Sequence, residues 1–212
     1  MMLSLPEAVT SELRVLVAAA RSLSRRPLEP LEVKPGWRRF GAMQRSSYGN
    51  IVAMLWLLIA LEAPAVHLIL GAIMVDGALR GVIRTLLLAT SIYLALWLLG
   101  DLRLLRETPG VLLGDDVLVV EMGVRVQGTV ALAQVTGAQL LGDQAANPSA
   151  GSGAIRITPQ PPPNCRIRLS SPARMRGLFG IPLRGELLDI YVDDPAGLVG
   201  ELEFRRTLTP CA

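Results

Sequence analysis

The chain of 212 residues is poor in the residue types from which most metal and redox sites are built. It contains one histidine, His67, and two cysteines, Cys165 and Cys211, which lie far apart and form no C-x-x-C pair. A multi-histidine metal site within one chain is therefore impossible, and neither a zinc ribbon nor a thioredoxin-like site is indicated. The sequence leaves a Cys165–Cys211 disulfide open, but it favours two free thiols.

Catalytic motifs are also missing. The sequence has no phosphate-binding P-loop, no dinucleotide-binding glycine pattern, no G-x-S-x-G and no H-E-x-x-H. A Ser-His-Asp triad would have to use His67, which lies inside a long apolar run. The net charge of +3 is too small to indicate a nucleic-acid partner. These absences favour a protein without cofactor or metal that is not an enzyme, with an enzyme of unrecognised site as a weaker alternative.

Long apolar runs are the strongest positive feature. Residues 51–75 contain only Glu62 and His67 as ionisable side chains, and Arg84 is the only charged residue in 82–100. A helix of 25 residues is about 37 Å long, which exceeds the roughly 30 Å of bilayer hydrocarbon. The two runs, separated by the short turn 76–81, predict a transmembrane helical hairpin. The alternative is a buried helical hairpin in a soluble protein.

Basic residues are distributed unequally around this hairpin. The turn carries only Arg80, with Arg84 at its edge. Six basic residues flank the open end of the hairpin: Lys34, Arg38, Arg39, Arg45, Arg103 and Arg106. Because basic residues accumulate on the cytoplasmic side of a membrane, we expect both termini to be cytoplasmic.

The segment before the hairpin predicts an amphipathic helix at residues 4–26 and a proline-rich linker at 27–36. Six apolar residues of the helix form one stripe: Leu5, Val9, Leu13, Leu16, Ala20 and Leu23. The stripe admits two interpretations, a helix that packs on its own protein or a helix that lies on a membrane surface. We therefore divide the chain into this N-terminal segment (1–36), the hairpin (37–106) and a C-terminal domain (107–212).

Short strands replace the apolar runs after residue 109. Segment 115–130 predicts two strands joined by a turn at Met122-Gly123, and further strands are expected at 134–141, 154–158, 165–170 and 186–194. Asp194 and Pro195 then begin a helix, as cap and first residue. The expected fold is membrane α + β: the hairpin followed by a small antiparallel β-barrel or sandwich with a C-terminal helix.

Two stretches of this domain resemble a known family. The segment DDVLVVEMGVRVQGTVALAQVTGAQLL, 115–141, is similar to the opening meander of bacterial pleckstrin-homology-like (PH-like) domains. The segment LLDIYVDDPAGLVGEL, 187–202, is similar to their last strand and closing helix. With the two apolar runs, the chain resembles bacterial two-span membrane proteins of unknown function that carry such a domain. The resemblance implies the bacterial inner membrane, with the lipid bilayer as a partner. Another membrane protein or a second copy of the chain is a further candidate partner.

The first candidate site lies inside the apolar runs. Glu62 falls near the bilayer midplane, where an ionisable residue costs about 2.5–3.5 kcal/mol. Pro64 leaves a backbone carbonyl of the helix without its donor. If the hairpin folds back near Leu79, His67 lies opposite Ser91, with Tyr93 in the same region. We favour hydrogen bonds of Glu62 and His67 that fasten the two helices together. The alternatives are a proton, ion or polar-ligand site in an assembly, and a contact with a partner membrane protein.

The second candidate site is an arginine-rich stretch, 166–185. Arg166, Arg168, Arg174, Arg176 and Arg184 accompany Phe179. Arginines around an apolar tip suit an anionic bilayer surface. The alternative is ordinary exposure of arginine on strands and loops.

These patterns favour a non-enzymatic integral membrane protein that presents a cytoplasmic PH-like domain for protein or lipid-surface interaction. The alternative is a subunit of a small membrane assembly that conducts protons or a polar solute through the Glu62 and His67 site.

Overall fold

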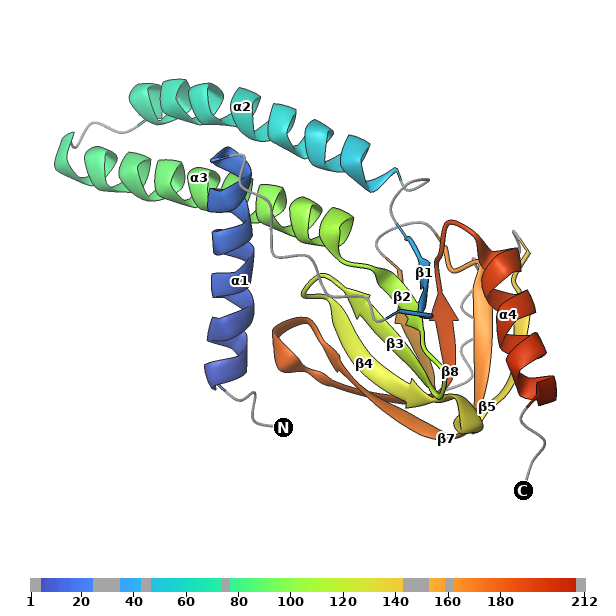
Figure 1. The fold of residues 1–212 in the computed structure, drawn as a ribbon. Coiled ribbons are helices and arrows are strands. Elements are labelled where there is room, and N and C mark those ends of the chain that lie inside the picture. Colours follow the sequence, from blue (N-terminus) through green and yellow to red (C-terminus); the bar gives the residue numbers. More distant parts are fainter. Residues whose placement is uncertain are drawn as a thin grey trace.

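The computed structural model describes residues 5–24, 35–42, 47–73, 77–142, 153–158 and 162–208. It has an N-terminal helix, a helical hairpin and a sheet domain closed by a C-terminal helix (Figure 1). Lys34, Arg45, Cys211 and much of the expected linker (27–36) lie outside the described residues.

Three helices precede most of the sheet. They are α1 (Leu5–Leu23), α2 (Tyr48–Ile73) and α3 (Gly77–Glu107). α2 and α3 lie side by side as a hairpin that projects away from the sheet, and α1 runs crosswise to α3 (Figure 1). α2 and α3 are long and apolar enough to cross a membrane, and hardly any of their apolar stretch is buried within the chain. The expected pair of apolar helices is confirmed. α3 is longer than predicted, because its first residues belong to the expected turn at 76–81.

The described residues form a sheet of eight strands. They are β1 (Arg38–Phe40), β2 (Gly110–Leu113), β3 (Val117–Met122), β4 (Val126–Ala131), β5 (Val135–Leu140), β6 (Ala154–Ile157), β7 (Cys165–Gly177) and β8 (Pro182–Ile190). The order is β1-β2-β3-β4-β7-β8-β6, and β5 pairs with the first part of the long strand β7. All pairs are antiparallel except β6 with β8. An antiparallel-dominated sheet is therefore confirmed.

Alternation along the strands builds the core. In β7, Cys165, Ile167 and Leu169 are buried, while Arg166 and Arg168 between them point to the other face. This is the period of two that a sheet with one buried face requires.

The helix that closes the sheet domain is α4 (Pro195–Leu208). Its start is capped as predicted, because the Gly197 amide donates to the Asp194 carboxylate at 3.0 Å. Leu198 and Leu202 of α4 are buried in the core of the sheet.

One part of the expected division differs from the structure. Residues 38–40 were assigned to the hairpin segment that begins at residue 37, but they form β1 and pair with β2. Phe40 of β1 is only 7 % exposed and belongs to the core. The sheet domain thus takes its first strand from before the hairpin, so both open ends of the hairpin connect directly to neighbouring strands.

Candidate functional site

The polar residues predicted inside the apolar runs are placed on α2 and α3. Glu62 is exposed on α2, Pro64 lies within the same helix without ending it, and His67 lies one turn further on, with its side chain outside the described set. Ser91 is half-buried on α3. Among the described residues, Glu62 has no hydrogen bond to α3. The predicted fastening by Glu62 and His67 therefore stays a prediction.

Tyr93 has a different partner from the one expected. Its hydroxyl donates to the Glu12 carboxylate of α1 at 2.7 Å. This bond links the middle of α3 to α1 rather than to α2. It marks the place where α1 crosses the hairpin.

The crossing is close because α3 has a glycine there. A Cβ added to Gly100 would lie 2.1 Å from the Val15 carbonyl oxygen of α1, far inside contact distance. Val15 and Ala18 of α1 are buried in a small cluster with Leu104 and Val124, and Trp97 packs against it. α1 is therefore a packed part of the protein, as one of the two interpretations of this helix required.

The hairpin is joined to the sheet by a buried polar cluster next to that glycine. Asp101 of α3 is fully buried. It accepts hydrogen bonds from the Tyr48 hydroxyl of α2 at 2.5 Å and from the Arg125 guanidinium of the β3–β4 turn at 2.7 Å. Arg125 also donates to the Tyr48 oxygen at 2.7 Å and lies over the Tyr48 ring. We call these three residues the joint.

The joint satisfies charges that would otherwise be costly to bury. Burial alone would lower the pKa of the Arg125 guanidinium, but the hydrogen bond and charge of Asp101 outweigh it and the pKa is raised. Because its members come from α2, α3 and the sheet, the joint fixes the direction of the hairpin relative to the sheet.

The arginine-rich stretch is divided by the structure. Arg166 forms a two-pronged ion pair with the buried Asp189, at 2.6 and 2.9 Å, which raises the pKa of the guanidinium. It therefore supports the sheet itself. Four others are exposed: Arg168, Arg174, Arg176 and Arg184. Phe179 is half-buried at the tip of the β7–β8 hairpin, with a φ of 58° that is unusual for a residue with a side chain.

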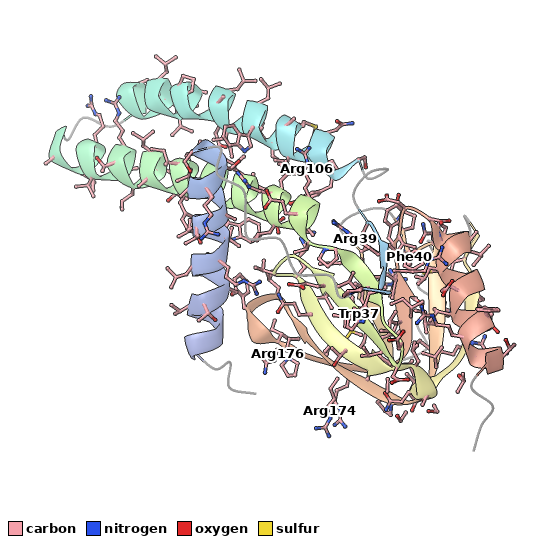
Figure 2. The ribbon with its side chains drawn as sticks, viewed as in Figure 1. Trp37, Arg39, Phe40, Arg106, Arg174 and Arg176 are labelled. Atoms are coloured by element: carbon pink, nitrogen blue, oxygen red, sulfur yellow. The ribbon has the colours of Figure 1, made fainter. Side chains whose placement is uncertain are left out.

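Arg176 is the arginine of this stretch that lies beside α1. A cleft of about 140 Å³ separates α1 from the β7–β8 tip, and Thr10, Ser11, Arg14 and Arg176 line it. Figure 2 shows Arg176 beside the β7–β8 tip, on the side of the N-terminal half of α1, and Arg174 farther from α1. The tip residue Leu178 packs against the buried cluster under α1. The β7–β8 tip and α1 therefore form one contiguous region.

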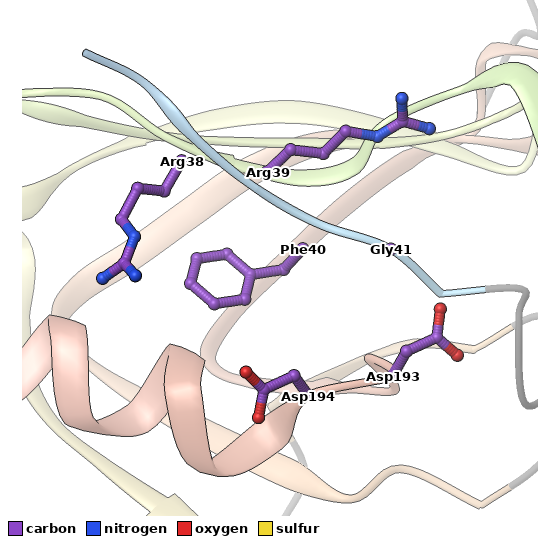
Figure 3. A pocket seen from close by; sticks show the side chains of 6 residues that line it. All are labelled: Arg38, Arg39, Phe40, Gly41, Asp193 and Asp194. Carbon is purple, nitrogen blue, oxygen red and sulfur yellow. The ribbon is translucent and has the colours of Figure 1, made fainter.

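A second pocket, of about 420 Å³, lies between β1 and the start of α4 (Figure 3). Arg38, Arg39 and Phe40 line one side, and Asp193 and Asp194 line the other. Its charged groups already hold the fold together. Arg38 pairs with Glu201 of α4, Arg39 donates to the Thr108 carbonyl, and Asp194 caps α4. The pocket is thus the open seam where α4 is attached.

Chemistry that would indicate an enzyme is not apparent in the described part of the chain. No group of three or more His, Cys, Asp or Glu residues there could hold a metal ion. Cys165 is a buried free thiol whose pKa is raised to about 12, first by burial and then by the charge of Asp189. A thiol in that state is a poor nucleophile.

Sequence reasoning missed the joint and Gly100. Asp101 is the first acidic residue after the second apolar run, and that position was the available signal. Its partners, Tyr48 and Arg125, are 53 and 24 residues away in the chain, and nothing local pairs them.

Comparison with protein-family models, with curated proteins and with solved structures finds no match to this chain.

Proposed function

We propose that this protein is a non-enzymatic membrane protein in which α2 and α3 anchor a cytoplasmic β domain that contacts proteins or lipid surfaces. The observation that carries the proposal is the exposure of large apolar side chains along both helices. On α2 these include Leu57, Leu58, Leu61, Leu68 and Ile69, each more than half exposed. Burial stabilises apolar surface by about 25 cal/mol per Å², so such helices require an apolar environment.

The joint supports this role for the hairpin. A buried ion pair at the base of two projecting helices ties the hairpin to the sheet, so the sheet follows the orientation of the hairpin in a bilayer. The proposed side is the cytoplasm of a bacterial inner membrane, because basic residues concentrate at the sheet end of the hairpin. The sheet and its closing helix support the finer proposal of a PH-like domain, through the meander β2–β3–β4 and the passage from β8 into α4.

The experiment that tests the proposal is a topology measurement on the full chain. Green fluorescent protein fused after residue 212 should fluoresce, and alkaline phosphatase fused there should be inactive. Alkaline phosphatase inserted after Gly77, at the closed end of the hairpin, should be active. Release of the untagged protein from membranes by alkaline carbonate, without detergent, would refute the anchor itself.

One observation favours a second candidate function. Glu62 is exposed on α2 about 16 Å from the end of that helix at Ile73, which is near the depth of a bilayer midplane. A carboxyl exposed to lipid costs about 2.5–3.5 kcal/mol, so a second copy or another membrane protein would cover it favourably. Such an assembly could conduct protons or a polar solute through Glu62 and His67.

Three variants of Glu62 separate the two candidates. Under the anchor function, Glu62→Gln and Glu62→Leu should both retain thermal stability in detergent, because a neutral side chain suffices. Glu62→Lys should lower it, because lysine keeps a charge and cannot accept a hydrogen bond. Harm from Glu62→Gln equal to that from Glu62→Lys, together with proton flux into liposomes that Gln abolishes, would instead establish the conducting assembly.

A further inference from the structure

The surface that carries the inference is the exposed apolar stripe of α1, made of Val9, Leu13, Val17, Ala20 and Leu23. The four large side chains are 46–66 % exposed. Their spacing of three or four residues places them on one side of the helix. This is nearly the stripe that the sequence singled out, yet it is not the side that packs on the protein.

The other two sides of α1 are occupied. Val15, Ala18 and Ala19 are at most 1 % exposed and face α3. Thr10 and Arg14 line the cleft toward the sheet, and Arg14 approaches Glu121 of β3 at 3.8 Å. Counted around the helix at 100° per residue, the middle of the apolar stripe lies about 150° from the side formed by Val15, Ala18 and Ala19, and about 120° from Arg14. It therefore faces away from α3 and obliquely away from the sheet domain.

The level at which α1 crosses the hairpin matches the edge of a bilayer. Contacts with α1 run from Tyr93, through its bond to Glu12, to Gly100. At 1.5 Å per residue, these positions are about 24 and 34 Å from the start of α3 at Gly77. The hydrocarbon layer is about 30 Å thick. If the closed end of the hairpin reaches the far interface, α1 lies at the near one.

Charge agrees with this placement. Arg21 lies in the last turn of α1, and Arg14 and Arg176 lie in the cleft on its sheet side. Amphipathic helices that lie in a membrane interface combine an apolar side with basic residues that attract anionic lipid headgroups.

We propose that α1 is an in-plane membrane helix whose apolar stripe inserts into the cytoplasmic leaflet of an anionic bilayer. The inference rests on the proposed anchor function of α2 and α3, and it adds a third membrane contact. Two spanning helices alone leave the joined hairpin and sheet free to tilt together in the bilayer. A crosswise helix in the interface removes that freedom and keeps the β7–β8 tip, with Arg176, beside the headgroups.

Spin labels on the full-length protein test the proposal in nanodiscs that contain phosphatidylglycerol. Cys211→Ser supplies the background, since the buried Cys165 thiol should not react. Single labels are then introduced through Leu13→Cys and Val17→Cys on the stripe. Ser11→Cys, in the cleft on the sheet side of α1, is the matched control, because Ser11 lies more than 100° from both stripe residues around the helix. Leu87→Cys reports the middle of α3. For each label, the collision rate with apolar molecular oxygen is compared with the collision rate with a water-soluble nickel complex.

The expected result is that both stripe labels favour oxygen, as Leu87→Cys does, whereas Ser11→Cys favours nickel. Stripe labels that favour nickel while Leu87→Cys favours oxygen would overturn the inference and leave the anchor intact. Nickel preference at Leu87→Cys would refute the anchor. Stripe labels shielded from both reagents, with spin–spin broadening, would show that a second copy covers the stripe, and would also overturn the proposal. Discs of phosphatidylcholine alone should reduce the oxygen preference at Leu13→Cys, and an unchanged value would overturn the role of anionic lipid.

Discussion

Replacing Asp101 by asparagine should destabilise the protein strongly. The loss should exceed that from a carboxylate-to-amide change at any other acidic residue in the half of α3 next to the sheet. Asp101 is 0 % exposed and accepts bonds from Tyr48 and Arg125. Asparagine has nearly the same shape, but it carries no charge and has one acceptor oxygen in place of two. If that oxygen takes the place of Oδ2, the new amide donor faces Nε of Arg125, which is another donor.

The magnitude follows from burial. Breaking a buried ion pair by removing one partner costs about 3–5 kcal/mol, because the other charge stays buried and uncompensated. The Arg125 side chain is 26 % exposed, so water compensates part of its charge. We therefore expect the lower end of the range, about 3 kcal/mol. For a chain of this size that corresponds to a fall in Tm of about 6–12 °C.

The assay is thermal unfolding of the purified full-length protein in detergent, followed by fluorescence. Asp115→Asn is the matched control, because it makes the same chemical change at an exposed turn. The free energy of unfolding of this variant should stay within about 0.5 kcal/mol of that of the parent. A double-mutant cycle with Arg125→Gln should give a coupling energy of about 1–3 kcal/mol. Equal Tm values for Asp101→Asn and Asp115→Asn, or additive effects of Asp101→Asn and Arg125→Gln, would refute the joint as a stabilising pair.

Three further outcomes follow from single contacts. Gly100→Ala should lower the free energy of unfolding by about 1–3 kcal/mol, because the added methyl group forces α1 away from α3. In Gly81→Ala, in the same helix, the methyl group meets no neighbour, so this variant should be neutral or slightly stabilised. Thermal unfolding of both variants distinguishes them. The Cys165 thiol should resist iodoacetamide at pH 8 in the native protein and react after denaturation, since its pKa is about 12; native labelling would contradict its burial. The pKa of Glu201 is lowered, chiefly by its hydrogen bond from Arg205. The stability that the Glu201 carboxylate contributes is thus present above its ordinary pKa of 4.5 and is lost as pH falls toward its lower pKa in the folded protein. The Tm difference between Glu201→Gln and the parent should therefore shrink as pH falls below 4.5.

Features of the fold that depend on local patterns were predictable from sequence. The two apolar helices follow from run length, the β3–β4 hairpin from alternation about Met122-Gly123, and the start of α4 from Asp194 and Pro195. Each signal lies within the element that it specifies. β1 was missed because a strand of three residues has no pattern of its own, and Arg38–Phe40 becomes a strand only by pairing with β2, about 70 residues later.

The packing side of α1 was unpredictable for a different reason. The large apolar residues Val9, Leu13 and Val17 dominate the helical pattern, but they remain exposed. The side that packs on α3 uses Val15 and Ala18, and it can approach closely because Gly100 lies against the Val15 backbone. A periodicity argument weights side chains by hydrophobicity, whereas close helix packing selects small ones.

Gly100 and Asp101 are adjacent, and this adjacency couples the three parts of the protein. Gly100 admits α1 against α3, and Asp101 binds the sheet through Arg125 and the start of α2 through Tyr48. α3 continues unbroken from Gly77 to Glu107, so both contacts are made by the helix that would cross the bilayer. Under the proposed function, a change in the tilt of α3 must therefore move α1 and the sheet together. If lipid holds α1 in the interface, the same connection resists that tilt, and the orientation of the sheet at the membrane is set by two successive residues.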